Sequence, residues 1–453
     1  MNTFPMPPTR PLTLAVVIAC SAHILGASTQ ASAQTKAPPQ VVKPPIALAY
    51  IDVATASSDM PGGNMMAGMA QGGSSGGLFG ALGGLARGAA GGVTGGGNTF
   101  GNTRSMGFGS GRYVDVSVYT NKNRSLAEAT QRIPSVMSLG ESLKLVAPVP
   151  DKPLPPDLVD EKPYEPTYEK PKGKMSIYWG CGENIRPGQP RTLDVATAKI
   201  EDFGKFFVSR GSTTKGARSQ PGHPAWPNKQ DDRQVPETAS LVGQHSFVGT
   251  GIPDSFKVAL GAPQDLMPAI QLQQTKNETG VNLEWQTIPH ARGYFIAVMG
   301  GKSDGGDSGE TIFWTSSELA DVGFGLIDYQ SNTNIDKWLG EKVILPATAT
   351  KCAVPKGIFP EGAGGMLRMI AYGSEAFFAF PPRPTDPKIA WEPDWNTKVR
   401  VKSTHFSMLG GMGDGESRSR GGRSQESKQD AKPEKKEEKK PNPVDLLKGL
   451  FGR

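Results

Sequence analysis

The sequence is poor in the residues that most catalytic and metal-binding sites use. Its 453 residues include only three cysteines and five histidines. The cysteines form no Cys-x-x-Cys pair and no two histidines lie four residues apart, so zinc and dithiol chemistry are not expected. The motifs of hydrolases and phosphate-binding loops are incomplete. We therefore expect no catalytic residue, no metal and no cofactor.

Charge is also scarce and nearly balanced. Charged residues make up 20% of the chain, and the net charge is +6. They do not form a basic face with interleaved aromatic residues, which is typical of proteins that bind nucleic acid. Nucleic acid is therefore not an expected partner.

One apolar run near the N-terminus predicts export. Arg10 precedes the run Leu12–Ala27, and Ala31-Ser32-Ala33 supplies small residues for cleavage, so residues 1–33 are expected to form a signal peptide. An alternative is that the tetrapeptide ending at Cys20 (VIAC) resembles the lipobox of bacterial lipoproteins. Either interpretation predicts a protein of the periplasm or cell envelope.

The two remaining cysteines, Cys181 and Cys352, are an even pair. In an oxidising compartment such a pair favours one disulfide. The alternative is two buried free thiols, because the sequence does not fix the distance between their Cα atoms.

Glycine is abundant, with 57 residues. Between Gly68 and Gly96 it recurs at every fourth position, so Gly80, Gly84 and Gly88 would share one face of a helix. This spacing resembles the glycine-zipper segments of bacterial envelope proteins. The resemblance implies packing against an envelope protein or a second copy, or membrane association. A flexible spacer is the alternative, and Arg87 opposes a full membrane span.

The N-terminal strand region is expected at 45–148, with the glycine-rich insert at 61–111. Two apolar stretches, 45–55 and 113–120, predict strands that pair across this insert. Ser125 and Glu128 form a capping-box pattern that predicts a short helix. A proline-rich linker is expected at 149–173.

Residues 174–405 contain many short strand-like segments separated by turn residues. This rhythm predicts an all-β fold with an antiparallel β-sandwich core. One helix is expected at 334–342, because Ile335, Trp338 and Leu339 share a face. Residues 406–440 are predicted to be a disordered charged linker.

Part of this region, 266–381, resembles a fibronectin type III-like, immunoglobulin-like domain. The resemblance depends on Leu283-x-Trp285, followed by Ala291, Gly293 and Tyr294. It implies a scaffold or binding module and no particular reaction. The long insert 316–365 departs from the family pattern.

The last residues, 441–453, predict a short amphipathic helix. Asn442 is a suitable cap, Pro443 suits the first helical position, and Val444, Leu447 and Phe451 then line one face. This helix would be a tethered anchor, and a frayed tail is the alternative.

Three tryptophans are candidates for ligand binding. Trp391 and Trp395 flank a Pro-Asp turn, and Trp226 lies between prolines. Their rings would offer apolar faces to a sugar or a protein, or would pack under long loops. The sequence thus predicts an exported, envelope-associated structural or binding protein without catalytic activity. A glycan-binding periplasmic protein is the alternative, followed by an envelope hydrolase.

Overall fold

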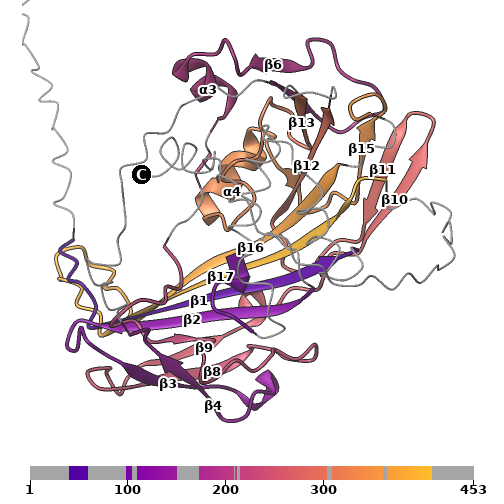
Figure 1. Ribbon diagram of the computed structural model, residues 1–453. Helices are drawn as coiled ribbons and strands as arrows, with labels where there is room; N and C mark the ends of the chain where they lie inside the picture. The colour runs from indigo at the N-terminus through magenta and orange to yellow at the C-terminus, as the bar shows by residue number, and fades with distance from the viewer. Residues whose placement is uncertain are drawn as a thin grey trace, which may run out of the picture.

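The computed structural model describes residues 40–59, 98–104, 110–149, 173–208, 210–211, 215–303, 309–360 and 365–410. Strands dominate these residues, which bears out the all-β prediction (Figure 1). In chain order the strands are β1 (Ala47–Ser58), β2 (Gly111–Thr120), β3 (Glu128–Arg132), β4 (Ser142–Val146), β5 (Lys174–Trp179), β6 (Arg191–Asp194), β7 (Ala225–Trp226), β8 (Gly243–Val248), β9 (Lys257–Leu260), β10 (Leu272–Asn277), β11 (Gly280–Trp285), β12 (Gly293–Ser303), β13 (Gly309–Thr315), β14 (Leu345–Pro346), β15 (Lys351–Pro355), β16 (Met366–Phe380) and β17 (Trp395–Met408). The helices are α3 (Ile200–Phe206) and α4 (Asn332–Gly340), with short 3-10 turns η1 (Asn102–Arg104), η2 (Ser135–Met137) and η4 (Ala262–Gln264).

Fourteen of the described strands belong to one large sheet. Its order is β6-β5-β13-β12-β16-β17-β1-β2-β7-β4-β3-β8-β9, with β14 paired to β12. Two pairs within it, β1 with β17 and β13 with β5, are parallel. The antiparallel pairing expected for the β-sandwich core is therefore wrong for these pairs. The strands of each pair are far apart in the sequence, so no tight hairpin fixes them as antiparallel.

Strand β1 lies at the centre of this sheet, between β17 and β2 (Figure 1). It pairs with β2 in antiparallel register, Ile51 opposite Val116, which confirms the predicted pairing across the glycine-rich insert. The N-terminal region 45–148 and the region 174–405 thus share one sheet. They are not separate units, because β1 completes its hydrogen bonds with strands from both regions.

A second sheet, β10-β11-β15, forms another layer. Its buried residues Leu283 and Val354 belong to the same apolar core as Met369 of the large sheet. The Trp285 ring lies 5.6 Å from the Tyr294 ring, measured between centroids, so the two layers meet through aromatic contact. Such contacts between inner faces are how stacked sheets bury their apolar sides.

The predicted helix at 334–342 is confirmed as α4, whose Ile335 and Trp338 are buried. Its Ser331 cap accepts a hydrogen bond from the Asn334 N–H at 3.1 Å. The helix predicted from Ser125 and Glu128 is wrong, because β3 begins at Glu128 and pairs with β4 and β8. Long-range pairing overrides the local capping signal.

The boundary at residue 406 is also corrected. Strand β17 continues to Met408, and Phe406 is buried opposite Arg368. Several predictions lie outside the described residues: the signal peptide 1–33, Cys20, the glycines Gly80, Gly84 and Gly88, the linker residues 150–172, the charged residues 411–440 and the helix 441–453. Neither helix of the described residues is long and apolar enough to cross a membrane.

Candidate functional site

The long central strands have one apolar face and one polar face. On the apolar face, Ile51, Val116 and Val399 pack into the core between the sheets. On the other face, Asp52 of β1 is opposite Asp115 of β2 and, on its other side, Arg400 of β17. Residues paired directly across a ladder point to the same face. A row of charges therefore crosses the centre of the sheet.

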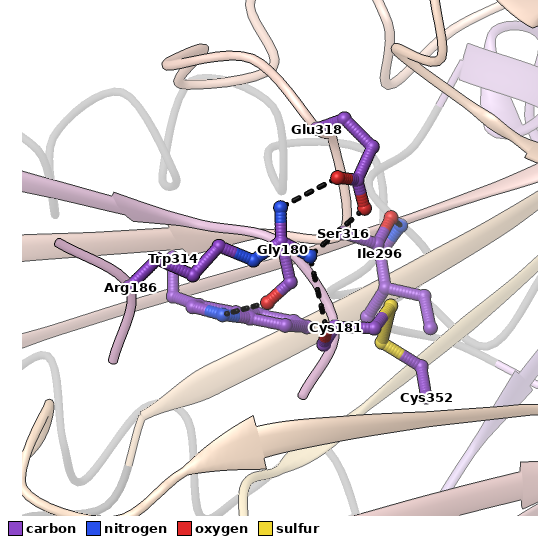
Figure 2. The surroundings of a disulfide bond; sticks show 8 residues. All are labelled: Gly180, Cys181, Arg186, Ile296, Trp314, Ser316, Glu318 and Cys352. Atoms are coloured by element: carbon purple, nitrogen blue, oxygen red, sulfur yellow. Dashed lines mark hydrogen bonds and ion pairs between the residues drawn. A yellow bond between two sulfur atoms is a disulfide. The ribbon is translucent and has the colours of Figure 1, made fainter. Parts of the chain in front are cut away.

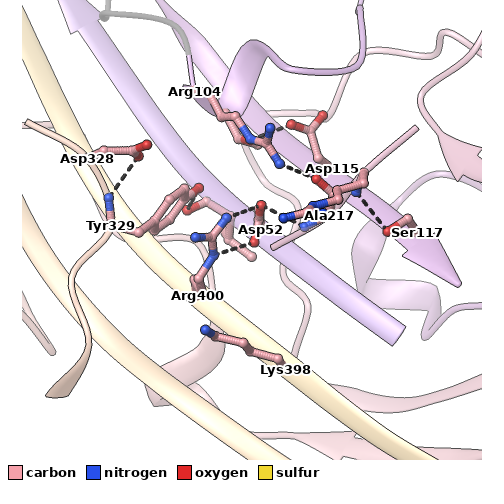
Figure 3. Close-up of polar contacts among 12 residues, drawn as sticks. Asp52, Arg104, Asp115, Ser117, Ala217, Asp328, Tyr329, Lys398 and Arg400 are labelled. Atoms are coloured by element: carbon pink, nitrogen blue, oxygen red, sulfur yellow. Dashed lines mark hydrogen bonds and ion pairs between the residues drawn. The ribbon is translucent and has the colours of Figure 1, made fainter. Parts of the chain in front are cut away.

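The middle of this row is a buried ion pair. The Arg400 Nε–H donates to Asp52 Oδ1 at 2.7 Å, and a second bond joins the Nη2 group to Oδ2 (Figure 3). Both side chains are almost fully buried. Burial lowers the pKa of Arg400, but the hydrogen bond and charge of Asp52 outweigh it, so the net pKa is raised. A two-pronged pair of this kind fixes β17 against β1.

Tyr329 lies against Arg400 of this row and against Lys402, which is two residues further along β17 on the same face. The ring centroid is 4.3 Å from the Arg400 guanidinium carbon and 4.4 Å from Lys402 Nζ. Lys402 Nζ also lies 2.8 Å from Asp328 Oδ1, and the Tyr329 hydroxyl donates to the Val53 carbonyl at 3.0 Å. Burial is the main cause that raises the pKa of Tyr329 well above its usual value. Tyr329 thus remains a neutral hydrogen-bond donor.

Asp115 lies at the other end of the row and accepts hydrogen bonds from the segment 98–104. The Gly101 N–H is 3.1 Å from each carboxylate oxygen, and the Thr103 hydroxyl also donates to Oδ2. Burial raises the pKa of Asp115 to about 7, and the neighbouring Asp52 charge acts in the same direction. The hydrogen bonds from Thr103 and Gly101 oppose this rise without cancelling it.

A second segment, residues 215–218, covers the row. The Ala217 N–H donates to Asp52 Oδ2 at 3.0 Å, and the Arg218 N–H donates to the Ser117 hydroxyl at 3.0 Å. Arg104 bonds to the Ala217 carbonyl, which joins the two covering segments (Figure 3). At Gly216 a Cβ atom would overlap the Arg400 guanidinium, so only glycine fits there. The row is consequently sealed from solvent.

Further along the same face the cover ends and a groove opens. The pairs Tyr50–Lys398 and Leu48–Asn396 follow Asp52–Arg400 in steps of two residues, so they share its face. The groove has a volume of about 560 Å³. Its lining residues are Leu48, Ala49, Tyr50, Phe377, Phe378, Ala379, Pro382, Arg383, Trp391, Asn396, Thr397 and Lys398.

Aromatic and cationic groups shape this groove. Phe377 is 69% exposed, and Trp391 is half-buried with its indole N–H donating to the Pro381 carbonyl at 3.0 Å. The Arg383 guanidinium carbon lies 5.6 Å from the Trp391 ring centroid. Lys398 Nζ forms an ion pair with Glu375 Oε2 at 2.8 Å. Glu375 is opposite Arg400 in the sheet, so this pair lies where the groove adjoins the buried charged row. The groove therefore offers aromatic surface beside fixed positive charge.

Only one of the three tryptophans predicted to bind a ligand lies in this groove. Trp226 is fully buried, and Trp395 is 5% exposed. The Trp395 ring stacks on Phe256 with centroids 4.8 Å apart, and its N–H donates to the Ser255 carbonyl at 2.7 Å. Trp226 and Trp395 are core residues, so their prediction as ligand-binding residues is wrong. Both belong to the main apolar core, which agrees with the alternative that these rings serve packing.

Cys181 and Cys352 form a disulfide with Cα atoms 5.1 Å apart (Figure 2). Cys352 belongs to β15 of the small sheet, whereas Cys181 follows β5 at one edge of the large sheet. The bond therefore ties the two layers together. Arg186 secures the turn after Cys181, because its Nη2 donates to the Cys181 carbonyl at 3.1 Å and to Glu318 at 3.0 Å.

Sequence reasoning missed the buried charged row. Asp52 and Asp115 lie in similar motifs, YIDV and YVDV, where an aspartate between apolar residues suggests a solvent-facing position. The signal that the sequence did contain was this repetition on two strands expected to pair. Within the described residues, no group of three His, Cys, Asp or Glu side chains is placed to hold a metal.

Comparison of the chain with protein-family models, curated proteins and solved structures finds no match. The site is consequently interpreted from its own geometry.

Proposed function

We propose that the chain is an exported, envelope-associated binding protein that acts without catalysis, and that its ligand is a glycan held in the groove beside Trp391. The observation that carries this proposal is the combination of exposed Phe377, half-buried Trp391 and polar Asn396 in one groove. Aromatic rings present flat apolar faces to sugar rings, and polar groups at their edges orient the hydroxyls.

The disulfide supports an extracytoplasmic location. Disulfides form and persist in oxidising compartments such as the periplasm. The bond between Cys181 and Cys352 closes a separation of 171 residues. It agrees with the signal-like N-terminus, so we propose the periplasm or cell envelope as the site of action. A mature chain that retains Met1 in the cytosol would contradict this location.

We further propose that the glycine-rich segment and the C-terminal residues 441–453 attach the protein to a membrane or an assembly. Residues at the described ends of the insert are hydrogen-bonded to the folded part of the chain. The Ser58 N–H donates to the Ser110 hydroxyl at 3.0 Å, and the Asn98 amide donates to the Arg233 carbonyl at 2.9 Å. The insert therefore leaves the sheet at the end of β1 and returns to it at the start of β2, where an envelope protein or a second copy would meet it.

Attachment through the glycine face predicts a position-specific effect. Leucine at Gly84 would separate packed backbones, whereas leucine at Ala81 lies off that face. Cross-linking in the native envelope should therefore decrease for Gly84→Leu and persist for Ala81→Leu. Equal cross-linking of both variants would leave the segment as a spacer.

The strand order supports a fibronectin type III-like sandwich for residues 272–408, which we propose as the scaffold of the groove. Apart from the two-residue β14, the first, second and fifth strands form the small sheet. The others form the order β13-β12-β16-β17 within the large sheet. The family divides its strands between two sheets in this way. Here β17 continues beyond the sandwich through its pairing with β1.

Retention on isolated envelope polysaccharide tests the glycan proposal. We expect Trp391→Ala and Phe377→Ser to lose retention while the far-UV circular dichroism stays that of the wild type. Ile389→Ala is the matched control, because Ile389 is 54% exposed nearby but does not line the groove. Equal retention of Trp391→Ala and wild type would exclude the groove as the glycan site.

A further inference from the structure

The charge of the groove is one-sided. Its lining contains two cations, Arg383 and Lys398, and no carboxylate. Lys398 is compensated by Glu375 at 2.8 Å. Arg383 forms no ion pair with any other residue that the structure describes. The groove therefore carries one guanidinium whose charge is uncompensated.

The position of this guanidinium is fixed by Gln40. The Arg383 Nε–H donates to Gln40 Oε1 at 2.6 Å. The Gln40 amide in turn donates to the Ile389 carbonyl at 2.8 Å and reaches the carbonyls of Pro384 and Asp386 at 3.4 Å. Because Nε is occupied by Gln40, the two Nη groups are the part of the fork that remains for a ligand. A planar fork of this kind matches the two oxygens of a carboxylate.

The surroundings of Arg383 select a hydroxylated ligand. The Trp391 ring lies 5.6 Å from the guanidinium, and its N–H is fixed on the Pro381 carbonyl. The Asn396 Oδ1 atom is buried without a hydrogen-bond partner among the described residues, although Asn396 lines the groove. A buried acceptor without a donor is costly, and a small rotation of the Asn396 amide into the groove would let a ligand hydroxyl satisfy it.

From these contacts we infer that the groove recognises carboxylate-bearing sugars, with Arg383 binding the carboxylate, Trp391 contacting the ring and Asn396 accepting a hydroxyl. This inference rests on the proposed glycan-binding function and adds the charge of the ligand to it. A neutral sugar would satisfy Trp391 and Asn396 but would leave the exposed Arg383 guanidinium to water, without an anionic partner.

Isothermal titration with oligogalacturonate and its fully methyl-esterified form tests the inference on the full mature chain. Both probes have the same sugar ring, and only the first carries carboxylates. We expect the wild type to bind the acid form about ten- to a hundredfold more tightly, as a charged hydrogen bond permits. Arg383→Gln should abolish this preference for the acid form and leave the affinity for the ester unchanged.

Three further variants separate the inference from the proposed function. Arg383→Lys keeps the charge without the fork, so it should recover only part of the preference. Arg132→Gln removes an exposed charge on β3, outside the groove, and should change neither affinity. Trp391→Ala should weaken both probes equally.

The possible negative results distinguish failure of the inference from failure of the proposed function. An unchanged acid-to-ester ratio in Arg383→Gln would overturn the inference, while the Trp391→Ala loss would still support the glycan site. If the wild type bound neither probe, or if Trp391→Ala bound both probes as the wild type does, the inference and the proposed glycan-binding function would both be overturned.

Discussion

On β1, Ile51 and Asp52 are neighbours in the sequence, and both side chains are fully buried. Ile51 faces the core between the two sheets, whereas Asp52 faces the charged row under residues 98–104 and 215–218. The apolar face gains stability from contact area and needs no particular partner. The polar face requires each buried charge to be matched. Although both faces of β1 are buried, we therefore expect the polar face to tolerate substitution less than the apolar face.

The largest difference between the faces is expected at Asp52. Asp52→Ala leaves Arg400 buried without its partner, which should lower the free energy of unfolding by about 3 to 5 kcal/mol. Urea denaturation measures this loss. The matched control is Glu318→Ala in the exposed Arg186–Glu318 pair, where we expect about 1 kcal/mol or less. A similar small loss for Asp52→Ala would show that the row is not an essential ion-pair network.

The apolar side is held by the disulfide as well as by contact. Replacing Cys181 and Cys352 by serine should lower the free energy of unfolding by about 2 to 4 kcal/mol, because the unfolded chain regains the entropy of an open loop. Denaturation with and without reductant measures it, and the double serine variant should no longer respond to reductant. A wild type that is equally stable in both conditions would contradict this role. Peptide mapping without reductant of protein from its native compartment checks the bond itself.

The polar face should also make stability depend on pH. The folded-state pKa of Asp115 is raised from 3.8 to about 7, so between these values the folded state holds a proton that the unfolded state has lost. This contribution to stability is complete below pH 3.8 and disappears as the pH rises through about 7. The expected slope is up to about 1.4 kcal/mol per pH unit.

Asp115→Asn isolates this effect, because the amide keeps an acceptor for Thr103 and Gly101 but does not titrate in this range. Urea midpoints should fall from pH 4 to pH 7 more steeply in the wild type than in Asp115→Asn. Parallel curves for the two proteins would assign the pH dependence to other groups.

The smallest effect is expected on the apolar face at Ile51. Ile51→Val removes one methyl group from a fully buried side chain, and such changes cost about 0.5 to 1.5 kcal/mol. Urea denaturation beside Asp52→Ala compares two adjacent, fully buried residues on opposite faces of the strand. A larger loss for Ile51→Val than for Asp52→Ala would reverse the proposed contrast.

The sequence determined the local features of this protein. The alternation of valines in 113–120 indicated a strand, and the shared face of Ile335 and Trp338 indicated a helix, because these patterns arise from the geometry of a single element. The pairing of β1 with β2 was also predictable, since both stretches present one apolar face. The even number of the two remaining cysteines favoured their linkage once export was assumed, but their distance came only from the structure.

Only the tertiary structure decided which buried positions carry charge and which aromatic residues reach a ligand. Trp391 and Trp395 are four residues apart in similar sequence context. In the structure, Trp391 lines the groove and Trp395 stacks on Phe256. Asp52 meets Arg400 across 348 residues of sequence. Contacts over such separations depend on how all the intervening strands order themselves in the sheet. A pattern within one strand contains no information about its partner from the other end of the chain.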